Sequence, residues 1–272
     1  MHGLMGFAGW QWMFVLEAVP AVVLGVVVLF WLTDKPQKAK WLSEEERNWL
    51  VTTLAAEQAQ RQSAAHHSAW KGLFDKRVLA LALVYFGTSA GLYTLGIWSP
   101  QIIKTMGLSP MAIGLLNAIP AVIAVAAMVL WARHSDKSGE RPWHVMAACL
   151  LAAVGLVFAG SAATIVGVIV ALTLVNCGIS ASKPPLWSMP TLFLSGSAAA
   201  AGIATINSIG NLGGFVGPFM IGVIKQHTGS FTWGLYFVAA LLALSSVTVL
   251  LLSAMARKAS ANSALAQPES IK

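Results

Sequence analysis

Seven apolar segments, each about twenty residues long, constrain the fold of this chain more than any other feature of its sequence. They lie at about 9–32, 78–100, 111–131, 144–162, 164–183, 199–223 and 231–256. In hydrocarbon every backbone N–H and C=O group needs an internal partner, so segments of this length cross a bilayer as α-helices. The sequence therefore predicts an all-α, polytopic membrane helix bundle with seven transmembrane helices.

Composition supports this class and argues against nucleic-acid binding. Apolar residues make up 57% of the chain and charged residues 10%, whereas a soluble domain carries about 25% charged residues. Basic residues outnumber acidic ones by 17 to 10, but they lie between the apolar segments, as membrane topology requires. We expect the lipid bilayer as a partner and no nucleic acid.

The distribution of Lys and Arg predicts the orientation of the chain. When the segments alternate across the bilayer, fourteen basic residues share the side of 33–77, 132–143 and the C-terminal tail. Only Lys104 and Lys225 fall on the other side. Basic residues concentrate in cytoplasmic loops, so the C-terminus is predicted to be cytoplasmic.

We expect four regions along the chain. They are an outer start with the first transmembrane helix (1–32), a cytoplasmic loop (33–77), a six-helix unit (78–256) and a disordered cytoplasmic tail (257–272). Within the loop, Ser43 and Glu46 have the spacing of a capping box, which predicts a linker helix over 43–62.

The segment from Gly202 to Pro218 is unusually polar and glycine-rich for a transmembrane helix. Two pairs of glycines are spaced by four residues: Gly210 with Gly214, and Gly213 with Gly217. Such pairs let a second helix backbone approach closely. Asn207 and Asn211 share one helix face, and an unpartnered asparagine is costly in hydrocarbon. The two asparagines either line a polar cavity or only bridge helices.

Candidate binding residues are neutral, because no Lys or Arg lies in the middle of a segment. The candidates, each within about 8 Å of the centre of its span, are Tyr93, Asn117, Asn176, Asn207 and Asn211. Tyr93 could equally be a core aromatic. Glu17, an acid inside the first segment, is either a proton carrier or a packing partner. Lys183 is expected at the cytoplasmic end of the fifth segment.

The sequence offers no support for an enzyme. It contains no His-Glu-x-x-His or Gly-x-Ser-x-Gly motif, and no histidine lies in the middle of a segment. A retinal protein would need a lysine in the last segment, which has none. We expect no catalytic residues, no metal and no cofactor.

The residues between the third and fourth segments resemble a cytoplasmic loop motif of the major facilitator superfamily. The match consists of Asp136, Lys137, Gly139 and Arg141, with Ala132 where the family usually has glycine. The resemblance implies a gating loop that fastens one conformation of a transport cycle. The alternative is a charged turn without such a role.

Three further stretches are similar to the anion:cation symporter branch of this superfamily, over residues 9–256. They are Gly9–Pro20 with the loop after it, Trp98–Gln101, and Asn207–Pro218. Members of this branch carry tartrate, phthalate, hydroxyphenylacetate and sugar acids. The order of the stretches implies family helices six to twelve, the C-terminal half of the fold plus one helix. We therefore expect a truncated product or a misassigned start.

The resemblance implies proton-coupled secondary active transport of a small organic anion by alternating access, in the cell inner membrane. Such transporters bind substrate between two halves, so the missing N-terminal half would be a partner and would carry the cationic groups. The alternative is a membrane fragment or assembly subunit that does not transport.

Overall fold

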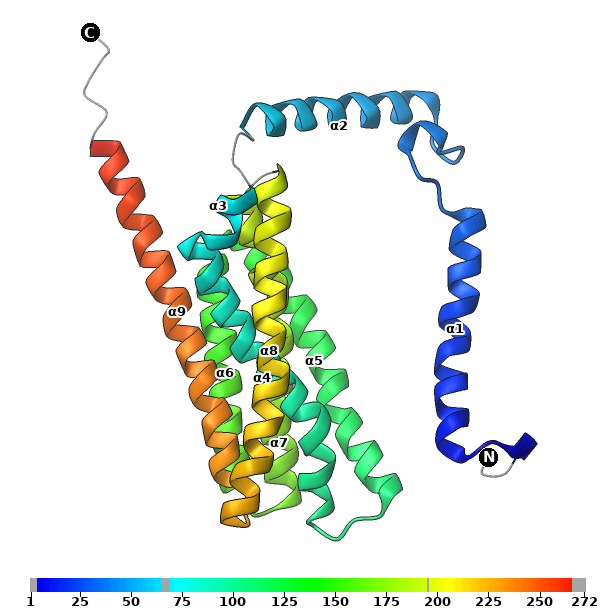
Figure 1. Ribbon diagram of the computed structural model, residues 1–272, viewed down its shortest axis with the longest axis vertical. Coiled ribbons are helices and arrows are strands. Elements are labelled where there is room, and N and C mark those ends of the chain that lie inside the picture. The colour runs from blue at the N-terminus through cyan, green and yellow to red at the C-terminus, as the bar shows by residue number, and fades with distance from the viewer. Residues whose placement is uncertain (1–3, 65–68, 195, 266–272) are drawn as a thin grey trace. The chain divides into compact units, whose positions relative to one another are not determined.

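The computed structural model describes residues 4–64, 69–194 and 196–265 (Figure 1). Within these ranges the chain is helical and contains no β-strand. Seven helices are long and apolar enough to cross a membrane, in the order that the apolar segments predict. The chain divides into two compact units, Met1–Ala64 and Ala65–Lys272.

The first unit contains α1 (Gly9–Trp31) and α2 (Glu44–Ala64), with short 3₁₀ turns at Leu4–Gly6 and Pro36–Lys38. Helix α1 is strongly apolar and buries none of its residues within this unit. The predicted capping box starts α2: the Ser43 N–H donates to Glu46 Oε2 at 3.0 Å, and the Glu46 N–H donates to Ser43 Oγ at 3.3 Å. These hydrogen bonds favour the charged carboxylate and lower the pKa of Glu46.

The second unit holds six of the spanning helices. Its elements are α3 (Ala69–Phe74), α4 (Lys76–Lys104), α5 (Pro110–Ser138), α6 (Arg141–Ser161), α7 (Ile165–Ser188), a 3₁₀ turn (Pro190–Leu192), α8 (Gly196–Thr228) and α9 (Thr232–Leu265). Helices α4, α6, α7 and α9 surround an apolar core that includes Leu81, Leu156, Leu172 and Leu242. Helix α5 packs on α7, and α8 packs mainly on α4.

The crossing of α4 and α8 is the most extensive helix contact in this unit, and Figure 1 shows α8 (yellow) alongside α4. A Cβ atom on Gly213 would lie 2.0 Å from the Phe86 carbonyl oxygen, and one on Gly217 would lie 2.7 Å from that of Ala90. The backbones meet there because neither glycine has a side chain. The predicted close backbone approach is confirmed at Gly213 and Gly217, whereas Gly210 and Gly214 lie against the Tyr85 and Tyr93 rings.

Several helices extend beyond the apolar segments, so the predicted ends were wrong. Helix α5 ends at Ser138 rather than near 131, and α7 ends at Ser188 rather than 183. Helix α9 continues to Leu265, which places a helix where the first part of the disordered tail was expected. Polar residues continue a helix as well as apolar ones once it enters water, so hydropathy marks the membrane and not the helix end. Residues 266–272 of the expected tail lie outside the described residues.

Candidate functional site

The two asparagines of α8 lie together on its exposed face. The Asn211 side-chain amide donates a hydrogen bond to the side-chain oxygen of Asn207. The Asn211 oxygen and the Asn207 amide group remain open, with no partner among the described residues. Open amide groups at mid-helix are costly against lipid, so this face favours a polar or water-filled space.

Tyr93 joins the asparagines from α4. Its side chain is 47% exposed, and its ring lies directly over Gly214, where an added Cβ would be 2.5 Å from the ring. Gly214 is three residues beyond Asn211, or about one helical turn. The Tyr93 ring therefore lies about one helical turn from Asn211, and the missing Cβ of Gly214 is what lets this ring approach α8.

Tyr85 connects this group to α7 and was not predicted. Its ring packs edge-to-face on Trp187 of α7, with centroids 4.9 Å apart. The same ring covers Gly210, the neighbour of Asn211, where an added Cβ would lie 2.0 Å from it. One aromatic side chain thus links the faces of α7 and α8.

Helix α7 presents a stripe of half-buried polar residues that sequence reasoning missed. The stripe, at alternating spacings of three and four, consists of Thr173, Asn176, Ser180, Lys183 and Trp187. This spacing places all five on one helix face. The three- and four-residue spacing is visible in the sequence, but only Asn176 and Lys183 were named as candidates, and each was considered separately.

Lys183 is a half-buried cation within this stripe. It lies five residues before the end of α7, rather than at the end as expected. It forms no ion pair or hydrogen bond with any residue that the structure describes. A half-buried ammonium without a counter-ion is costly, so this position favours a nearby anion. Lys183 lies one turn from Trp187, which Tyr85 connects to α8.

The other predicted binding residues form no hydrogen bond with Tyr93, Asn207 or Asn211. Asn117 on α5 accepts a 2.7 Å hydrogen bond from Ser99, and Asn176 donates to the Leu172 carbonyl of its own helix at 3.0 Å. Trp98, beside Ser99, donates to the Pro218 carbonyl at 3.1 Å. The Trp98–Ser99 pair therefore fastens α4 to both α5 and α8. Glu17 is exposed on α1 in the other unit.

The predicted gating loop is much shorter than expected. Asp136 and Lys137 lie in the last turns of α5, Arg141 begins α6, and only Gly139 and Glu140 connect the helices. Gly139 has φ +71°, a left-handed conformation that ends α5 and favours glycine. An Arg141 nitrogen lies 3.6 Å from the Asp136 carboxylate, so the acid and base of the motif are paired across the turn.

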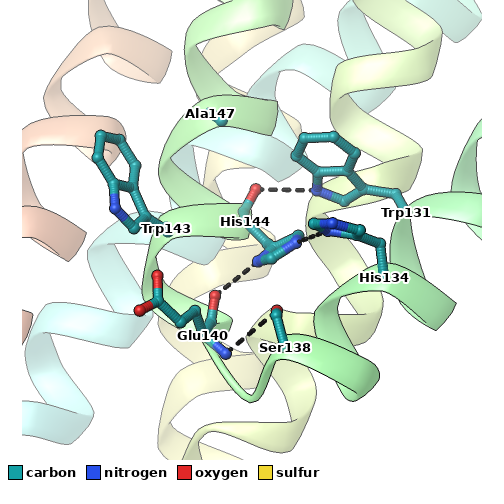
Figure 2. Close-up of a pocket in the computed structure, with 7 residues that line it drawn as sticks. All are labelled: Trp131, His134, Ser138, Glu140, Trp143, His144 and Ala147. Carbon is teal, nitrogen blue, oxygen red and sulfur yellow. Dashed lines mark hydrogen bonds between the residues drawn. The ribbon is translucent and has the colours of Figure 1, made fainter.

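A pocket of about 280 Å³ beside this turn contains two bonded imidazoles (Figure 2). His144 Nδ1 lies 2.6 Å from the Glu140 carbonyl oxygen, and His144 Nε2 lies 2.7 Å from His134 Nδ1. A carbonyl oxygen only accepts, so Nδ1 of His144 carries a proton and, in the neutral pair, His134 Nδ1 donates to His144. Trp131 donates to the His144 carbonyl at 3.1 Å. These bonds connect α5 and α6 on both sides of the turn.

Comparison with known proteins supports the expected family. A profile of the Major Facilitator Superfamily matches residues 1–218. An Agrobacterium vitis protein named "Putative tartrate transporter" is 72% identical over 253 residues, covering 93% of this chain and 58% of that protein. The "Quinolone resistance transporter" of Acinetobacter baumannii is 39% identical over 240 residues, covering 88% of this chain and 55% of that protein.

A solved structure shows the same fold. The proton:xylose symporter XylE, of the major facilitator superfamily, superposes with a TM-score of 0.64 at 20% identity. The match covers 88% of this chain and 55% of the symporter. The chain thus spans a little over half the length of each of these relatives.

Proposed function

Since this chain belongs to the Major Facilitator Superfamily, we propose that it forms part of a secondary transporter for a small organic anion, with a dicarboxylate such as tartrate as the first candidate. The observation that carries this proposal is the polar surface of Tyr93, Asn207 and Asn211, connected through Tyr85 to the stripe of α7. The name of the 72% identical relative supports tartrate as the substrate.

The chemistry of this surface suits a hydroxylated carboxylate. The open amide of Asn207 and the Tyr93 hydroxyl donate hydrogen bonds, while the Asn211 oxygen accepts one from a substrate hydroxyl. Lys183 supplies a positive charge at the cytoplasmic part of α7. One lysine does not neutralise a dianion, so we propose that a second set of helices, the N-terminal half in longer relatives, provides the opposite wall and further cationic groups.

The remaining predicted roles form part of the same proposal. The paired Asp136 and Arg141, with Lys137 and the Gly139 turn, fasten the cytoplasmic ends of α5 and α6 in one conformation of the cycle. Glu17 carries the coupled proton. The protein lies in the cell inner membrane with its C-terminus in the cytoplasm. Asn117 and Asn176 border the path that the substrate takes.

Uptake by a chimera tests the function. The chain is joined to the part of its 72% identical relative that it does not cover, and the purified product is reconstituted in vesicles. We expect saturable, pH-gradient-driven uptake of radiolabelled tartrate. The 272-residue chain by itself is the matched comparison, and we expect no accumulation from it. A chimera that inserts normally but takes up no dicarboxylate or other organic anion would refute the proposal and favour a non-transporting subunit.

A further inference from the structure

The seam between α6 and α9 contains two hollows at different depths. The first, about 270 Å³, lies at the start of α6 and is lined by Glu140, Pro142, Trp143, Leu250, Ser253 and Arg257. The second, about 390 Å³, is lined by alanine, valine and Tyr236 side chains of the same two helices, including Val154 and Ala243. One hollow is charged and the other is apolar.

The charged hollow holds an acid and a base that are not paired with each other. Neither Glu140 nor Arg257 forms an ion pair with any described residue, whereas the nearby Arg141 is paired with Asp136. Figure 2 shows the Glu140 carboxylate turned to the Trp143 side, away from the two imidazoles. Two open charges of opposite sign in one hollow complement a ligand that carries both signs.

The spacing of the hollows matches one leaflet of a bilayer. Trp143 and Val154 are eleven residues apart on α6, which is about 16 Å along a helix. That distance is about half of the ~30 Å hydrocarbon thickness. Trp143 is exposed, and tryptophan is enriched at the membrane–water interface. The charged hollow therefore lies at head-group level and the apolar one near the midplane.

We propose that this seam binds one phospholipid whose head group carries a primary ammonium, such as phosphatidylethanolamine. The ammonium donates to the Glu140 carboxylate, the phosphate faces Arg257, and one acyl chain follows the groove past Val154 and Ala243. A choline head group has no N–H to donate to Glu140, and a glycerol head group has no positive charge. The site thus favours ethanolamine over both.

Native mass spectrometry of the purified 272-residue chain tests this site. Ethanolamine, choline and glycerol phospholipids with identical acyl chains are added at equal concentration, and the retained lipid is counted. We expect the ethanolamine lipid to be retained most. Glu140→Gln and Arg257→Gln should each reduce its retention about two- to fivefold, as expected for exposed ion pairs. Lys104→Gln, an exposed charge change at the end of α4 outside both hollows, should leave retention unchanged.

Two further variants separate lipid binding from misfolding. Glu140→Asp keeps the carboxylate and should keep the preference, while Ala243→Trp fills the apolar hollow and should lower retention of all three lipids. Equal retention of the three lipids by the wild-type chain would overturn the proposal, as would unchanged retention in Glu140→Gln. Displacement of the lipid by an equal concentration of soluble phosphoethanolamine would also overturn it, since the acyl groove would then contribute nothing.

Discussion

Replacing Gly213 with alanine should weaken the contact between α4 and α8 because the added methyl group has no space. Its Cβ would lie 2.0 Å from the Phe86 carbonyl oxygen, and ordinary contact begins at 3.4 Å, so the two backbones would have to separate by about 1.4 Å. Overpacking of this kind costs about 1–3 kcal/mol. Alanine recovers about 1 kcal/mol in helix propensity, which leaves a net loss of about 0–2 kcal/mol.

The measurement is the free energy of unfolding in mixed micelles as the fraction of denaturing detergent rises, followed by tryptophan fluorescence. The matched control is Gly96→Ala on α4, where nothing lies within 4 Å of the added Cβ. We expect the control to be neutral or slightly stabilising. If Gly213→Ala is as stable as Gly96→Ala, the close approach of the two helices is not real and the reasoning fails.

Three further predictions concern the polar surface and the helix ends. In the chimera, Asn211→Ala should lower tartrate affinity about 10-fold or more, because a hydrogen bond to a charged ligand contributes about 1.5–3 kcal/mol. The control Thr248→Ala on α9 should leave the affinity unchanged. Equal tartrate affinities in the two variants would mean that Asn211 only contacts other helices. Lys183→Gln should weaken binding of dicarboxylates more than of monocarboxylates in a competition assay, and equal loss for both would argue against charge recognition. Asp75 caps α4 and its pKa is lowered by the Arg77 guanidinium, so Asp75→Ala should cost about 0.5–2 kcal/mol at pH 7. The charged Asp75 carboxylate stabilises the folded protein fully at pH values above the ordinary carboxyl pKa of about 3.9. This stabilisation is lost as the pH falls through the lower pKa that Asp75 has in the folded protein. The difference between wild type and variant should therefore shrink toward pH 3, and a constant difference would contradict the charge-based part of the cap.

The sequence predicts the number and order of the spanning helices well because membrane crossing depends on local composition. Glycine spacing also predicted that another helix approaches α8 closely, since four-residue periodicity is a property of one helix; the identity of that partner, α4, came from the structure. The ends of α5, α7 and α9 were missed because polar residues extend a helix without a hydropathy signal.

The site was only partly predictable, because it depends on contacts between helices. Asn207, Asn211 and Tyr93 were selected for their depth in the bilayer. The two asparagines are hydrogen-bonded to each other, and the Tyr93 ring lies over Gly214, one turn from Asn211. Asn117 was selected for the same reason, yet its partner Ser99 lies eighteen residues away, on another helix. Tyr85 was missed because its contacts with Trp187 and Gly210 join three helices that no local pattern connects.

The most direct test of the central claim is whether tartrate shields the α8 asparagine face from a water-soluble thiol reagent. The chimera carries Cys149→Ser and Cys177→Ser, and Asn211→Cys is compared with Leu251→Cys on the exposed apolar face of α9. We expect that Asn211→Cys reacts, that tartrate slows its reaction, and that Leu251→Cys in lipid stays unreactive. An Asn211→Cys variant that does not react, or reacts at the same rate with and without tartrate, would contradict the claim that this face lines the substrate path.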